Sequence, residues 1–161
     1  MSAPDLNAVK LITAALKADE TLGKAVDVIR GHRPSIQGKT LTSKPLIVAC
    51  PGGRSKESAS RNSSTVTAIV YVGIMAKLSS GQGVRDEIAD DLAELESLID
   101  FSEELERWFL PDSGQGRNFA GPSGNYTVVD PLTTDPAYDP DEAERGRFLS
   151  VIQVQLEELR A

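Results

Sequence analysis

The residues able to carry out covalent chemistry are few in this chain. His32 is the only histidine and Cys50 the only cysteine. A serine or cysteine nucleophile activated by histidine would have to use His32, which lies in a turn-like Arg-Gly-His-Arg-Pro stretch. Cys50 ends a short apolar run, and a cysteine in such a position is more often a small buried side chain than a reactive thiol. We therefore predict a surface histidine, a buried cysteine and no catalytic residue.

Two glycine-containing stretches have some of the features of anion-binding loops. Pro51-Gly-Gly-Arg-Ser-Lys follows an apolar run, but a P-loop requires GxxxxGK[ST] leading straight into a helix. Ser80-Gly-Gln-Gly precedes a predicted helix, where free N–H groups can hold an anion, but a turn that only starts the helix is the commoner structure. The sequence therefore predicts no cofactor site.

Acidic residues gather in two places, within residues 86–94 and 135–142. Neither stretch has the spacing of an EF-hand with its glycine and terminal glutamate. A solvated helix face explains the first, and turns around Pro136 and Pro140 explain the second. With one cysteine and no cluster of cysteine and histidine, a structural zinc has no ligand set. We predict no metal site.

Charge and hydropathy limit the possible partners. The chain has 17 basic and 24 acidic residues, a net charge of −7, and no run rich in lysine and arginine. Tight binding of nucleic acid by the whole surface is not expected from this balance. The first residues lack a basic segment followed by an apolar one, and no apolar run approaches the roughly 18 residues of a membrane helix. We expect a protein made in the cytoplasm.

Apolar spacing predicts two main helices. The first covers residues 5–18, with Asp5 as its N-cap, and the second covers residues 84–99. Ser102 is expected to cap a further short helix through Trp108. The second helix should pack its apolar stripe on a sheet. The predicted contacts join Ile88, Leu92 and Leu95 to Val70, Val72, Phe148 or Ile152.

Alternating and β-branched segments predict strands at residues 24–31, 46–49, 65–78, 126–129 and 148–156. Residues 54–64 contain no large apolar side chain, and residues 111–125 are rich in glycine and proline, so exposed loops are expected near 51–64 and 111–125. The predicted fold is a single α+β domain, residues 1–161, with a mostly antiparallel sheet of about four or five strands and two main helices packed on it.

Taken in order, several segments resemble the tail terminator, or tail completion protein, of long-tailed bacteriophages. The resemblance covers about residues 5–158. Besides the helix at 84–99, the segments are Pro51-Gly-Gly, Ser60-Arg61, Val70-Tyr-Val-Gly-Ile, Asp135-Pro-Ala-Tyr-Asp-Pro and Phe148-Leu-Ser-Val-Ile.

The resemblance implies a structural virion protein of the tail and neck, without enzymatic activity. Such proteins form a six-membered homomeric ring on the tail tube, end its polymerisation and present the surface that joins tail to head. The implied partners are other copies of the chain, the tail tube protein and the head–tail connector protein, while DNA passes through the ring without tight binding and no membrane is involved.

Three basic residues of the predicted polar loop, Arg54, Lys56 and Arg61, are the candidate contacts with the adjacent subunit or the tube. Two alternatives stay open. The first is another head–tail connector of the neck, a stopper or an adaptor, which shares small size and ring symmetry. The second is a small phosphate-binding enzyme that would use Pro51-Gly-Gly-Arg-Ser-Lys.

Overall fold

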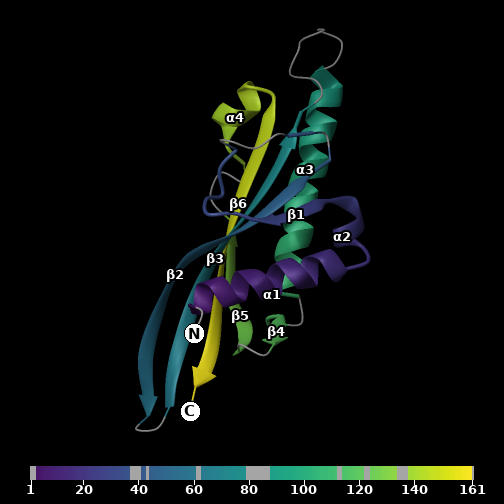
Figure 1. Ribbon diagram of the computed structural model, residues 1–161. Helices are drawn as coiled ribbons and strands as arrows, with labels where there is room; N and C mark the ends of the chain where they lie inside the picture. Colours follow the sequence, from purple (N-terminus) through teal and green to yellow (C-terminus); the bar gives the residue numbers. More distant parts are fainter. Residues whose placement is uncertain are drawn as a thin grey trace.

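A six-stranded sheet forms the framework of the protein in a computed structural model, which describes residues 3–36, 41, 42, 44–60, 63–78, 88–111, 114–121, 124–133 and 138–160. Its strands lie in the order β1-β2-β3-β6-β5-β4 (Figure 1). Their bounds are Asp27–Arg30 for β1, Leu46–Ser60 for β2, Ser63–Lys77 for β3, Asn118–Gly121 for β4, Gly124–Thr133 for β5 and Arg147–Arg160 for β6.

The sheet is mixed. β1 runs parallel to β2, and the other neighbouring pairs are antiparallel. The predicted fold class, a mostly antiparallel sheet of four or five strands, is therefore wrong. The two parallel strands are separated by 15 residues of sequence, which is enough for the crossover connection that parallel neighbours require and a tight hairpin does not provide. The additional strand is β4, which lies inside the glycine-rich segment 111–125 that was predicted to be a loop.

In the described part of the chain, four helices accompany the sheet: α1 at Pro4–Ala18, α2 at Leu22–Ala25, α3 at Ile88–Phe109 and α4 at Pro140–Glu144. α1 crosses the sheet and contacts both β1 and β4, the strands at its two edges, while α3 packs on β5 and β6. The sheet is curled into a half-barrel around α1 (Figure 1), which places both edge strands against this one helix.

The main core lies between the helices and the concave face of this sheet. Strict alternation places the even-numbered residues of β3 from Val66 onward and most of those of β6 on that face, where they are buried. Val70, Val72, Phe148 and Ile152 belong to this cluster, and Leu95 packs against the cluster. The particular contacts predicted for Leu95 stay a prediction. The side chains of Ile88 and Leu92 lie outside the described residues. Farther along α3, the cluster includes Leu98, Leu105, Trp108 and Phe109.

Two helix boundaries differ from the prediction. α1 begins at Pro4 with Ala3 as its N-cap, so Asp5 sits in the first turn instead of capping it. α3 runs without a break through Ser102 to Phe109. Ser102 is not a cap because its hydroxyl is buried against the sheet, 3.0 Å from the hydroxyl of Ser150 in β6. The Ser102 hydroxyl therefore bonds to a buried side chain and not to the backbone N–H that a capping serine would bind.

The described residues of the polar segment 54–64 are strand and not the exposed loop that their composition predicted. Residues 54–60 continue β2, and residues 54–58 pair with 64–68 of β3. Ladder hydrogen bonds join backbone groups, so a neighbouring strand can order a segment that has no large apolar side chain.

The second face of the sheet carries a small cluster of Ile36, Val48, Cys50 and Met75. Cys50 is a free, buried cysteine and His32 is exposed, so both of these predictions are confirmed. Pro34 lies over Gly73, where an added Cβ would come within 3.3 Å of the proline ring. Pro34 and Ile36, which follow β1, therefore cover this part of the second face.

Candidate assembly interface

The longest feature of the molecule is the hairpin of β2 and β3, two strands of 15 residues each. Its distal part extends past α1, as Figure 1 shows at the lower left of the molecule. β2 continues for residues 55–60 beyond Gly53 and Arg54, which bond to Asp5 of α1, and this corresponds to about 20 Å at about 3.3 Å per residue. The hairpin therefore offers a surface well away from the core.

One edge of this hairpin is open. β1 pairs with β2 only from Leu46 to Ala49, and the N–H of Gly31 donates to the carbonyl of Ala49 as the last bond of that ladder. From Cys50 onward, no described strand lies along the outer edge of β2. Unpaired N–H and C=O groups along such an edge can accept an added strand.

Two of the three predicted contact residues, Arg54 and Lys56, lie on β2 of this hairpin. Arg54 is exposed on β2, but its guanidinium lies 3.4 Å from the carboxylate of Asp5 in the same chain. That carboxylate also accepts a hydrogen bond of 3.2 Å from the N–H of Gly53, so it attaches the start of α1 to β2. Lys56 pairs through its backbone with Val66, and its side chain is not described. Arg61 lies outside the described residues. Their contacts with another subunit stay a prediction.

A groove of about 650 Å³ opens beside this edge, between α1 and the segment from β1 to His32. Leu6, Lys10 and Lys17 line it from one stripe of α1, since they are spaced by about one and two helical turns. Ile29 and Arg30 line it from β1. Leu6 and Ile29 are 46% and 40% exposed, two of the three large hydrophobic residues exposed in the described part of the chain.

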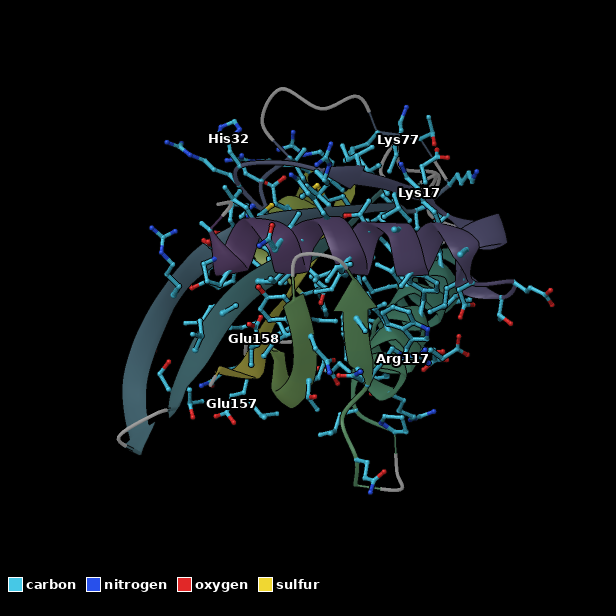
Figure 2. The ribbon with its side chains drawn as sticks, turned by 60° about the horizontal axis from the view of Figure 1, so that its bottom comes forward. Lys17, His32, Lys77, Arg117, Glu157 and Glu158 are labelled. Carbon is cyan, nitrogen blue, oxygen red and sulfur yellow. The ribbon has the colours of Figure 1, made fainter. Side chains whose placement is uncertain are left out.

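The charge of the groove is opposite to that of the protein. Its titratable lining residues are Lys10, Lys17, Arg30 and His32, and no carboxylate is among them. Within the described ranges, no carboxylate lies within 4 Å of Lys10, Lys17 or Arg30. Lys17 and His32 lie on one side of α1 in Figure 2, away from Glu157 and Glu158 on β6. The groove is thus a local basic and apolar surface on an acidic chain.

The opposite charge is concentrated on α3. Its exposed face carries Glu96, Asp100 and Glu103, at steps of four and three residues, and Glu104 beside them. Arg107 is the single basic residue in the last turn and lies 3.8 Å from Glu103. The neighbouring Glu106 is half-buried, and burial followed by repulsion from Glu103 raises the pKa of its carboxyl. α3 therefore presents an acidic ridge.

A polar junction holds α1 and α3 in a set orientation. The indole N–H of Trp108, at the end of α3, donates to Asp19 over 3.0 Å just after α1 ends. Arg117 lies over the Trp108 ring at 4.2 Å and donates from Nε to the Trp108 carbonyl. The backbone N–H of Leu22 is the main cause of a lowered pKa at Asp19, with Thr21, Trp108 and Arg117 adding to it against the effect of burial. These contacts therefore tie the C-terminal end of α1 to the C-terminal end of α3.

Sequence reasoning missed the groove and this junction. Lys10 and Lys17 share a helix stripe, but nothing local indicates that β1 brings Arg30 beside them.

In the part of the chain that the structure describes, no three residues among histidine, cysteine, aspartate and glutamate are placed to hold a metal ion. No helix within the same ranges is long and apolar enough to cross a bilayer.

Comparison with known proteins gives the chain no family. No family model matches it, and no curated protein does. One solved structure that carries no functional name aligns with 98% of this chain and 96% of its own, at 14% identity and a TM-score of 0.48.

Proposed function

We propose that this protein is a ring-forming structural subunit of a phage tail, of the tail terminator type, which caps the tail tube and provides the joining surface for the head. The observation that carries the proposal is the β2–β3 hairpin, which extends past the helices and has an open outer edge along residues 50–60. The ordered series of tail-terminator-like segments in the sequence supports the same function.

A capping subunit needs two kinds of contact. It binds a neighbour on each side through different surfaces, which closes a ring when the rotation between subunits allows. It also binds the last tube ring. The hairpin suits either contact because an edge strand gives affinity through backbone hydrogen bonds. Residues 54–60 are polar or small, so the isolated subunit exposes this edge without a large apolar patch.

Charge supports a role in which DNA passes without being held. Each copy has a net charge of −7, and a lumen that bound phosphates through lysine and arginine would retain the genome. In this proposal the protein is made in the host cytoplasm, is incorporated into the virion and needs no cofactor.

The test uses the tail tube protein that the proposal requires in the same genome. Tube subunits are polymerised with and without the purified protein and imaged by electron microscopy. We expect a six-fold ring at one tube end and a shorter length distribution, because a capped end adds no further subunits. Tubes of unchanged length with bare ends would contradict the proposal, and a ring found only on the head connector would favour a stopper or adaptor.

A further inference from the structure

The basic groove and the acidic ridge lie on different parts of the sheet. The groove is beside β1 and the first residues of the open β2 edge, because Pro51 also lines it. The ridge is on α3, which packs on β5 and β6 toward the other edge. A subunit with complementary surfaces on different sides is suited to head-to-tail contacts, in which each copy uses one surface toward each neighbour.

Spacing along the two helices agrees with such a contact. Lys10 and Lys17 are seven residues apart on α1, and Glu96 and Glu103 are seven residues apart on α3, so each pair spans about 10 Å. All four side chains are exposed. Antiparallel or parallel alignment of the two helices would bring both pairs of opposite charge together at once.

The shape and polarity of the groove also match those of the acidic ridge on α3. Ala93 and Ser97 flank the acidic stripe on α3 and are exposed and small, so the acidic side chains stand out as a narrow ridge. On the other side, Leu6 and Ile29 form an apolar floor that a bare phosphate or a small anion would leave uncovered. A helix can cover that floor with its alkyl stems and small residues while its carboxylates meet the basic rim.

We propose that the groove between α1 and β1 receives the acidic face of α3 from the next copy of the chain, an inference that rests on the proposed ring. Lys10 and Lys17 pair with Glu96 and Glu103 of that copy, and Arg30 and His32 lie within the same positive field. The contact would sit beside the open β2 edge, so strand addition and helix docking would act on the same side of the subunit.

The experiment is a charge swap within one chain. One variant carries Lys10→Glu and Lys17→Glu, a second carries Glu96→Lys and Glu103→Lys, and a third combines all four changes and restores the net charge of −7. Lys77→Glu and Glu144→Lys, exposed residues outside groove and ridge, are matched controls. Self-association is measured by sedimentation equilibrium and native mass spectrometry at about 50 mM salt, where charge contacts are least screened. Circular dichroism verifies that each variant folds.

We expect each double reversal to weaken self-association about tenfold or more, and the combined variant to recover most of that loss, because reversed charges attract again. The controls should stay close to the wild type. Recovery is the decisive readout, since damage to the fold or removal of an unrelated contact would not be repaired by further substitutions.

Other outcomes overturn the inference. Association that is unaffected by either reversal would place the interface elsewhere and leave the proposed function standing, since tube capping is measured separately. If the groove reversal weakened self-association and the combined variant did not restore it, the groove would bind a surface of the next copy other than α3. If duplex DNA bound the wild type and not the groove variant, the groove would be a binding site for a polyanion. A chain that stays monomeric at low salt would also overturn the contact, whatever the capping result.

Discussion

At the scale of single residues, Asp19 joins more elements than any other acid described here. It accepts hydrogen bonds from the N–H groups of Thr21 and Leu22 and from the indole of Trp108. Asp19→Ala removes all three acceptor contacts and should lower the free energy of unfolding by about 1 to 2 kcal/mol. Urea melts check this, with exposed Glu20→Ala as the neighbouring control, expected to change stability little.

The same substitution predicts a pH dependence. The folded pKa of Asp19 is lowered, chiefly by the Leu22 N–H, so its ionised form is favoured in the folded state. Its contribution is therefore present above the unfolded pKa of about 3.9 and is lost as pH falls through the folded value. The difference in stability between wild type and Asp19→Ala should be constant near neutral pH and shrink below about pH 4. A difference that grew on acidification would contradict the assignment.

The Ser102–Ser150 pair gives a second prediction at this scale. The two hydroxyls lie 3.0 Å apart, with both residues buried between α3 and β6. Ser150→Ala should cost about 1 to 3 kcal/mol because the Ser102 hydroxyl loses its partner in a dry site. Adding Ser102→Ala should cost little more, since neither polar group then remains unpaired. Denaturant melts of the two single variants and the double variant form the cycle, and additive costs would show that the hydroxyls do not interact.

At the scale of elements, α3 is held by its buried stripe. Leu105 is fully buried in the main core near Trp108 and Phe109, and Leu105→Ala should destabilise the protein by about 2 to 5 kcal/mol through lost contacts and a cavity. Val129→Ala serves as the control, because Val129 is 41% exposed and should change stability by no more than about 0.5 kcal/mol. A cost of similar size at both positions in denaturant melts would show that α3 does not carry the core.

The distal hairpin should matter for assembly and little for folding. A variant that lacks residues 57–65 and joins Lys56 to Val66, which are paired across the hairpin, through an Asn-Gly turn keeps the contact between Asp5 and β2. We expect near wild-type thermal unfolding, with loss of the ring and of tube capping, because the removed part contains no large apolar side chain and only Ser64 and Thr65 in it pair with β6. Unchanged capping by the shortened protein would exclude the hairpin as an assembly surface.

At the scale of the whole molecule, net charge determines whether the assembled protein binds duplex DNA. Six copies, each with a net charge of −7, carry about −42 in total. If the groove is covered by the next copy, its basic residues are removed from the channel. We predict no micromolar binding of duplex DNA to the assembled protein in a mobility-shift assay at about 50 mM salt, where non-specific binding is strongest. Binding that weakens steeply by about 200 mM salt would indicate a neck protein that grips DNA.

The part of this fold that sequence reasoning predicted is the part governed by local periodicity. Alternation at residues 65–78 and 148–156 predicted β3 and β6, and steps of three and four from Ile88 predicted α3, because burial on one face imposes the period of the element itself. The buried Cys50 and the exposed His32 followed from equally local patterns.

Which strands pair with one another depends on the tertiary structure and not on local sequence. Residues 54–60 are polar, yet they form a strand because β3 offers a ladder of backbone groups beside them, and backbone hydrogen bonds leave no pattern in side chains. The parallel partner β1, the short β4 and the unbroken course of α3 past Ser102 depend in the same way on what lies alongside. The groove unites Lys10 and Lys17 with Arg30 because the curled sheet brings β1 to α1, and no spacing along the chain encodes that distance.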